Sequence, residues 1–246
     1  MKRIQDLIRN LAGKRHYSLV RYEAKHRRAW MDAVTAAQSE RPLLLNHCEA
    51  CQLISAVTAT GKLGGNMAEL GVAYGASAKL ICDFAPGRTL HLFDTFDGLP
   101  APAERDSVKF AAKQFQSGIE SVRRYLDGRD VVFHKGLFPA TAAPVSGMVF
   151  SFVHLDADLY ESTIEGLKFF YPRLCPGGII LCHDYLSADG VDAAVREYFA
   201  DKPEPVIERT GYQCLIVKAA GRAVGNDEPG ALQEDLRRLS RTPAGR

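Results

Sequence analysis

Three side chains that can bind metal or move protons follow two apolar segments of the chain. Asp156 comes directly after the run 148–155, which is rich in Val and Phe, and His183-Asp184 comes after the apolar run 179–182. Carboxylates and imidazoles can remove protons, and together they can hold a divalent cation that lowers the pKa of a hydroxyl. We therefore predict a catalytic role for Asp156 and His183, and a metal site formed by Asp156, His183 and Asp184. The alternative is that these polar residues only end strands in solvent.

A further carboxylate nearby favours a different role. Asp158-Leu159-Tyr160-Glu161 precedes an apolar stretch with helical spacing, and Asp-x-x-Glu is similar to a capping box. We therefore predict that Asp158 caps a helix and is not a ligand.

A glycine-containing turn lies earlier in the chain. Glu69-x-Gly71-x-x-x-Gly75 follows an apolar strand pattern and precedes a helical one, and Asp94 lies 23 residues after Gly71. Glycines let the backbone pass close beneath a ligand, and an acid at the end of the next strand can accept hydrogen bonds from ribose hydroxyls. A nicotinamide dinucleotide needs a tighter G-x-G-x-x-G turn, and Glu69 would repel its pyrophosphate. The pattern therefore favours S-adenosylmethionine, which carries cationic groups, over a dinucleotide or a plain βα turn.

Alternating patterns along the chain indicate the elements that position these residues. Apolar β-type segments occupy 66–70, 89–93, 130–133, 148–155, 179–182, 205–209 and 213–218. Helical patterns occupy 42–63, 78–84, 110–126, 162–174 and 191–199, and a break near Gly118 is an alternative for the third of these. This alternation predicts an α/β fold, a parallel sheet with helices on both faces. Ligands bind such sheets at the carboxyl ends of the strands, where the acids and the glycine turn are expected.

The two ends of the chain differ from this central part. Residues 1–30 carry nine Lys/Arg against two acids, and Ile4, Leu7, Ile8 and Leu11 have helical spacing. We predict an N-terminal helical extension over 1–45, acting as a substrate lid or an oligomer contact, a main domain over 46–218 and a loose tail over 219–246. The basic residues could contact an acidic membrane surface or an anionic substrate, although a solvated face packed on the protein or on another subunit is favoured.

Composition excludes several classes of protein. The chain has 246 residues, 46% hydrophobic and 24% charged, with a net charge of +2, so we expect no nucleic-acid binding. No apolar run approaches the ~20 residues of a membrane span, and no secretory signal is evident. The six cysteines are scattered, and His47, Cys48 and Cys51 lack the second pair that a zinc site requires. We therefore expect buried thiols and a cytoplasmic protein.

Four segments together resemble the macrocin O-methyltransferase family. They read AELGVAYGAS, HLFDTFDGLP, HLDADLYESTIEGLKFFYPRLCPGG and HDY, and the resemblance extends over about residues 66–199. Members are class I S-adenosylmethionine-dependent enzymes that methylate sugar hydroxyls in natural products. The resemblance implies a Rossmann-like, seven-stranded, mostly parallel sheet with an antiparallel last strand, a magnesium site and a homo-oligomer. We therefore predict an acceptor that is a sugar of a natural product or of a surface polysaccharide.

Residue roles follow from the same resemblance. Glu69, Gly71, Tyr74, Gly75 and Ser77 would surround the methionine part of the cofactor; Asp94 would hold the ribose, with Thr95 and Phe96 beside it; and the turn ending in Gly136 would lie near the adenine or the substrate. Asp156 would be a metal ligand and the candidate base, and His183 and Asp184 would supply the other ligands.

One residue departs from the family pattern. Metal-binding members carry two adjacent acids where this chain has His183-Asp184. Imidazole is a poor ligand for Mg²⁺ and suits softer ions, so His183 either changes the choice of metal or acts as a metal-free base. Catechol and caffeoyl-CoA methyltransferases have a similar arrangement, which leaves a phenol as the alternative acceptor. A hydroxylase of the same fold is a second alternative, and a non-catalytic cofactor-binding protein is a third.

Overall fold

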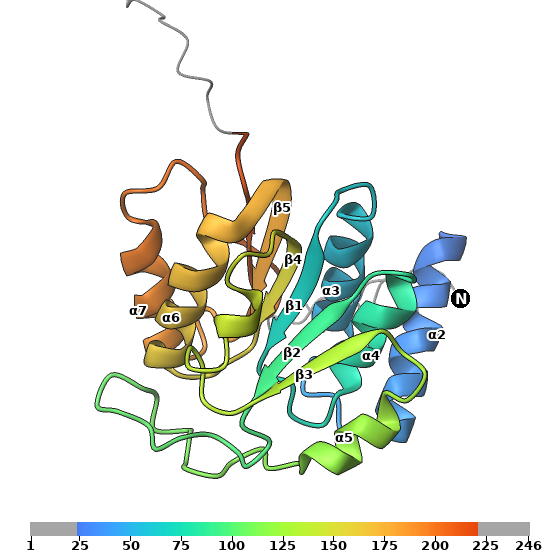
Figure 1. The fold of residues 1–246 in the computed structure, drawn as a ribbon, viewed down its shortest axis with the longest axis horizontal. Coiled ribbons are helices and arrows are strands. Elements are labelled where there is room, and N and C mark those ends of the chain that lie inside the picture. The colour runs from blue at the N-terminus through green and yellow to red at the C-terminus, as the bar shows by residue number, and fades with distance from the viewer. Residues whose placement is uncertain (1–23, 221–246) are drawn as a thin grey trace, which may run out of the picture.

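A single mixed sheet forms the centre of the protein in the computed structural model, which describes residues 24–220. Its strands are β1 (Asn66–Leu70), β2 (Leu90–Asp94), β3 (Val131–Lys135), β4 (Phe150–Leu155), β5 (Leu174–Cys182), β6 (Ile207–Glu208) and β7 (Cys214–Val217). They are ordered β3-β2-β1-β4-β5-β7-β6, and β7 runs antiparallel to both of its neighbours. Figure 1 shows the order of the strands β1 to β5. The predicted seven-stranded, mostly parallel sheet with an antiparallel last strand is confirmed.

Helices cover both faces of this sheet (Figure 1). They are α2 (Lys25–Glu40), α3 (His47–Ala59), α4 (Ala76–Phe84), α5 (Ile119–Tyr125), α6 (Tyr160–Phe170) and α7 (Asp189–Phe199), with short 3₁₀ helices η1 (Ala143–Val145) and η2 (Tyr171–Arg173). The helices α2, α3 and α4 pack on one face, and α6 and α7 pack on the other. Within residues 24–220, every helix is too short or too polar to cross a bilayer.

The strand β4 supplies side chains to two apolar cores, one on each side of the sheet. All six of its residues are buried. Because successive side chains of a strand point to opposite faces, Phe152 joins the core beneath α3 and α4, whereas Val153 joins the core beneath α6 and α7. This double burial explains why the segment is a nearly continuous apolar run.

The chain order brings the ends of β1 and β4 together. After β1 the chain proceeds outward through β2 and β3, and it then returns to place β4 on the other side of β1. The two strands are paired in register, with Leu70 opposite Leu155. Such a reversal of strand order opens a crevice at the carboxyl edge, where open α/β sheets bind ligands.

The helix predicted over 110–126 is present only in its second half, as α5, and the residues before it form part of an irregular segment, 100–118. Lys113 and Phe115 have φ values of 65° and 63°, which no helix can accommodate. The segment is instead a loop closed at its base, where Leu99 donates its N–H to the carbonyl of Gln114 and Lys113 donates its N–H to the carbonyl of Leu99.

The helix predicted over 42–63 is also shorter than expected. It begins at His47, because Asn46 and Glu49 form a complete capping box there. The amphipathic pattern at residues 4–11 and nearly all of the predicted tail over 219–246 lie outside the described residues, so these two predictions remain predictions.

Candidate active site

A cavity of about 370 Å³ opens at the carboxyl edge of the sheet. Its walls come from the segment before α3, the turn between β1 and α4, the end of β2 with the loop that follows it, residues 136–138 after β3, and the ends of β4 and β5. Polar residues that line it include Ser77, Asp94, Lys109, Asp156, Asp158, His183 and Asp184, and apolar residues include Leu43, Leu99, Phe110, Phe115, Leu137 and Phe138.

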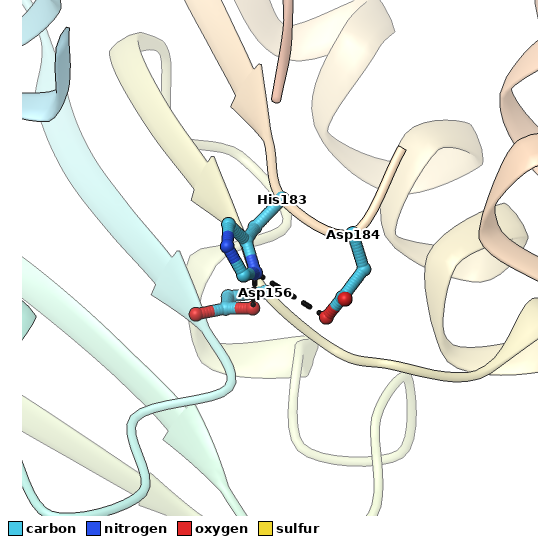
Figure 2. Close-up of side chains that lie close together, drawn as sticks. All are labelled: Asp156, His183 and Asp184. Carbon is cyan, nitrogen blue, oxygen red and sulfur yellow. Dashed lines mark hydrogen bonds and ion pairs between the residues drawn. The ribbon is translucent and has the colours of Figure 1, made fainter. Parts of the chain in front are cut away.

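The three residues predicted to carry the chemistry meet in this cavity. His183 Nδ1 lies 2.9 Å from Asp156 Oδ1 and 3.2 Å from Asp184 Oδ2 (Figure 2). Backbone hydrogen bonds fix the two strand ends, since Asp156 N donates to the carbonyl of Leu70 and His183 N donates to the carbonyl of Leu155, both at 2.8 Å. Parallel strands that end at one edge therefore place the three side chains together, as the sequence predicted.

Neighbouring charges determine the protonation of this group. Burial alone would lower the pKa of His183, but Asp156, Asp184 and Glu49 raise it far above its ordinary value. Burial would raise the pKa of Asp184, but His183, Ser187 and Lys109 lower it well below its ordinary value. The Lys109 ammonium lies 3.0 Å from Asp184 Oδ1. When Nδ1 of His183 binds no cation, the ring is thus held as an imidazolium beside an ionised Asp184. In this state His183 is a poor proton acceptor.

The donor set is compatible with a bound divalent cation. One ligand atom from each of Asp156, His183 and Asp184 lies within 4.8 Å of the others. One imidazole nitrogen and two carboxylate oxygens suit ions softer than Mg²⁺, such as Mn²⁺. Among the residues described, His47, Cys48 and Cys51 form no such group. The site fits a cation, and the most suitable ion differs from the magnesium that the family resemblance implies.

The prediction that Asp158 caps the helix α6 is wrong. The N-cap of α6 is Leu159, without a side-chain cap, and Asp158 itself has a φ of 63°. The N–H of Tyr160 is instead bound at 2.7 Å by Asp106 Oδ1 from the loop 100–118. Asp158 lines the cavity, and burial together with Asp156 and Asp184 raises its pKa well above the ordinary value.

The glycine turn and Asp94 form the opposite wall. Asp94 Oδ2 accepts the N–H groups of Val72 and Ala73 at 2.7 and 2.9 Å, and Oδ1 accepts that of Phe96 at 2.6 Å. Asp94 therefore fixes the turn after β1 and faces the cavity with it. Of the predicted cofactor residues, Gly71, Tyr74, Ser77, Asp94, Thr95 and Gly136 line the cavity, whereas Glu69, Gly75 and Phe96 do not.

Glu69 lies beneath the cavity, with no exposed surface. Its Oε1 is 2.9 Å from Nδ1 of His154 on the neighbouring strand β4, and burial raises its pKa. Glu69 thus lies behind the cavity wall, and its contact with a cofactor stays a prediction. Burial on both faces of the sheet leaves a β1 side chain no open face toward solvent.

Several residues that line the cavity or lie behind its wall were not predicted from the sequence. Lys109 and Phe110 come from the loop 100–118, whose path depends on tertiary contacts. Glu49, at the start of α3, lies 3.5 Å from Nε2 of His183. The pattern Asn46-x-x-Glu49 is typical of a capping box, so the start of the helix could be predicted from the sequence. The contact between Glu49 and His183 could not be predicted in this way.

Comparison with known proteins places this arrangement in a family. The family model described as Macrocin-O-methyltransferase (TylF) matches residues 8–208. The 8-demethyl-8-(2,3-dimethoxy-alpha-L-rhamnosyl)-tetracenomycin-C 4'-O-methyltransferase of Streptomyces olivaceus is 31% identical over 172 residues, covering 63% of this chain and 64% of that protein. The demethyldecarbamoylnovobiocin O-methyltransferase of Streptomyces niveus is 32% identical over 127 residues, covering 46% of this chain and 48% of that protein. The chain thus spans less than two thirds of the length of these relatives.

Solved structures agree with this placement. The O-methyltransferase NovP superposes with a TM-score of 0.61 at 26% identity, over 69% of this chain and 78% of that chain. The calicheamicin methyltransferase CalS11 shares the fold with a TM-score of 0.57 at 18% identity, over 80% of this chain and 94% of that one. A Rossmann-like fold, a cavity at the strand ends and a family match over most of the sequence lead to one conclusion: this chain belongs to the macrocin-O-methyltransferase (TylF) family.

Proposed function

We propose that this protein transfers a methyl group from S-adenosylmethionine to a hydroxyl of a sugar in a natural product or a surface polysaccharide. The observation that carries the proposal is one cavity lined by Gly71 and Asp94 on one wall and by Asp156 and His183 on the other. Family membership supports the reaction class. The names of the Streptomyces olivaceus relative, a methyltransferase of a rhamnosyl compound, and of the novobiocin-type relative support the acceptor class.

The proposed mechanism gives each wall of the cavity a separate task. The turn 71–77 would hold the methionine part of S-adenosylmethionine, which would supply the methyl group, and Asp94 would hold its ribose. The acceptor hydroxyl oxygen attacks this methyl in line; the C–O bond forms as the C–S bond breaks, and the proton passes to Asp156. His183 binds Asp156 Oδ1, so we assign the other oxygen as the proton acceptor. Orientation of the two reactants supplies much of the acceleration.

We further propose that Asp156, His183 and Asp184 hold a divalent cation softer than Mg²⁺. When bound, such an ion would position the oxygens of the acceptor and lower the pKa of the hydroxyl that is methylated. We expect Mn²⁺ to bind protein that has been treated with a chelator, and Asp184→Asn to weaken this binding at least ~10-fold because one of three ligands loses its charge. Calorimetric titration with Mn²⁺ and with Mg²⁺ measures both affinities. Full activity in excess chelator together with a flat Mn²⁺ titration would exclude a metal role.

The cofactor proposal has its own test. Asp94→Ala is expected to weaken S-adenosylmethionine binding by ~10–100-fold, or about 1.4–2.7 kcal/mol. The variant loses the ribose acceptor and releases the N–H groups of Val72 and Ala73. The matched control is Asp97→Ala, which removes an exposed carboxylate paired with Lys135 and should leave the affinity within ~2-fold. Calorimetry that detects no binding to cofactor-free wild-type protein would end the methyltransferase proposal.

The apolar wall of the cavity keeps a phenolic acceptor as the second candidate. Leu99, Phe110, Phe115 and Phe138 could contact an aromatic ring or the apolar part of a glycoside. A panel of catechols and caffeoyl esters assayed beside rhamnosylated compounds separates the two acceptor classes.

We also propose that the N-terminal extension contributes to acceptor binding. The segment 42–45, which joins α2 to α3, lines the cavity. Leu44 remains half-exposed there, as expected for a residue that an acceptor would cover.

A further inference from the structure

Glu49 occupies a position that its role in helix capping does not explain. It is the third residue of α3, and its Oε2 accepts the N–H of Asn46 at 2.8 Å, while Asn46 Oδ1 accepts the N–H of Glu49 at 3.1 Å. Capping-box acids belong to the first turn of a helix, which is commonly at the surface. Only 2% of Glu49 is exposed, however. Its carboxylate is therefore held inside the protein at a desolvation cost that the cap alone does not require.

A distant turn encloses this carboxylate. Tyr212, in the turn between β6 and β7, donates its N–H to Glu49 Oε1 at 2.9 Å. The adjacent Gly211 has a φ of 86°, and a Cβ at this position would lie 2.5 Å from Glu49 Oε1. The glycine thus permits the turn to pack directly on the acid, and the two backbone N–H groups fix both carboxylate oxygens.

The remaining neighbour of Glu49 is the imidazole of the active site. Glu49 Oε2 lies 3.5 Å from Nε2 of His183, at the distance of an ion pair, and this buried nitrogen has no hydrogen-bond partner among residues 24–220. The opposite ring nitrogen, Nδ1, faces Asp156 and Asp184. The ring therefore lies between the carboxylate of Glu49, outside the cavity, and the carboxylates of Asp156 and Asp184, which line it. Burial alone would raise the pKa of Glu49, but His183 and the two N–H groups lower it, so the acid is anionic beside the ring.

We propose that Glu49 is a positioning residue for the active site, because its carboxylate faces Nε2 of His183 and so aims Nδ1 between Asp156 and Asp184. An acid that holds one ring nitrogen determines which face of an imidazole is presented on the other side. The orientation serves both states of the site, since Nδ1 faces the same two carboxylates whether it carries a proton or binds a cation. The proposal rests on the proposed function only for its kinetic consequence, and the orientation itself is tested separately.

The orientation is measured by NMR on the full chain without cofactor. We expect a ring N–H signal from His183, identified by its loss in His183→Asn, that exchanges slowly with water. In Glu49→Gln, the single amide oxygen cannot face both the N–H of Tyr212 and Nε2 of His183. Exchange of the ring N–H with water should therefore be at least ~10-fold faster, or the signal should be lost. The matched control is Asn46→Ala, which removes the other half of the capping box and leaves the Glu49 carboxylate in place. This control should keep the signal despite losing about 1 kcal/mol of helix capping.

Unchanged exchange in Glu49→Gln would overturn the proposal. If circular dichroism shows that this variant does not fold, Glu49→Asp replaces it, because the shorter acid keeps the charge but withdraws from the ring. A protected ring signal in Glu49→Asp would overturn the proposal equally.

Kinetics supply the second measurement. We expect kcat to fall ~10–100-fold in Glu49→Gln, with KM for S-adenosylmethionine within ~2-fold of wild type, and Asn46→Ala to keep kcat within ~2-fold. Equal losses of kcat in both variants would assign Glu49 a purely structural role and overturn the proposal. The NMR result decides the orientation even if no acceptor is methylated, so failure of the proposed function is distinguishable from failure of this inference.

Discussion

Asp156→Asn is expected to lower kcat by ~10²–10⁴-fold, the range for loss of a positioned general base. An amide has nearly the same shape as a carboxylate. In the wild-type protein His183 Nδ1 lies 2.9 Å from Asp156 Oδ1, and the amide oxygen of the variant can still accept the Nδ1–H. The variant should therefore fold and bind S-adenosylmethionine with an affinity within ~3-fold of wild type. Only its capacity to take the hydroxyl proton, and to ligate a cation with full charge, is lost.

Initial rates with an identified acceptor, combined with calorimetry of cofactor binding, check this result. Asp97→Asn is the matched control, because its carboxylate is exposed on the neighbouring loop and should leave kcat unchanged. A variant at position 156 that retains more than about a tenth of the wild-type kcat would contradict the assignment of Asp156 as the base.

Gly71→Ala is expected to be the most damaging substitution in the cofactor turn. A Cβ at Gly71 would lie 1.8 Å from the carbonyl oxygen of Asp156, and the φ of 89° is itself unfavourable for alanine. The strands β1 and β4 would have to separate where the turn meets the acids. Steric strain and overpacking together should remove about 2–4 kcal/mol from the free energy of unfolding. We also expect cofactor affinity to fall at least ~100-fold.

Urea unfolding of Gly71→Ala and of the control Gly128→Ala separates the steric overlap with Asp156 from the strain of a positive φ. Gly128 has a φ of 76°, and no atom lies within 4 Å of a Cβ placed there. This control should lose only about 1 kcal/mol, from backbone strain, and should bind the cofactor normally. Equal losses of stability in the two variants would show that close approach at Gly71 is unimportant.

The fold and the central group of the site could be predicted from the sequence because local patterns determine them. β4 is a continuous apolar run because it is buried on both faces, and its end therefore locates Asp156. Once two parallel strands are neighbours, their carboxyl ends coincide, which brought Asp156 to His183 without any knowledge of the loops.

The remaining features depend on contacts between distant parts of the chain. The capping interpretation of Asp158 was wrong because Asp106, 54 residues away, binds the N–H of Tyr160. The helix predicted over 110–126 was wrong in its first half because Lys113 and Phe115 adopt positive φ values in a loop that packs on α6 and α7. Glu49 gave no functional signal because its second backbone donor, Tyr212, lies 163 residues away.

The closed base of the loop 100–118 has a consequence for engineering. The two hydrogen bonds that join Leu99 to Lys113 and Gln114 bring the ends of the loop together without help from the sheet. The intervening residues supply Lys109 and Phe110 to the cavity, and Asp106 ties the loop to α6. We expect that a segment of this kind can be exchanged between homologues as a unit. Such an exchange should alter acceptor preference while the cofactor turn and the acids at the strand ends keep their positions.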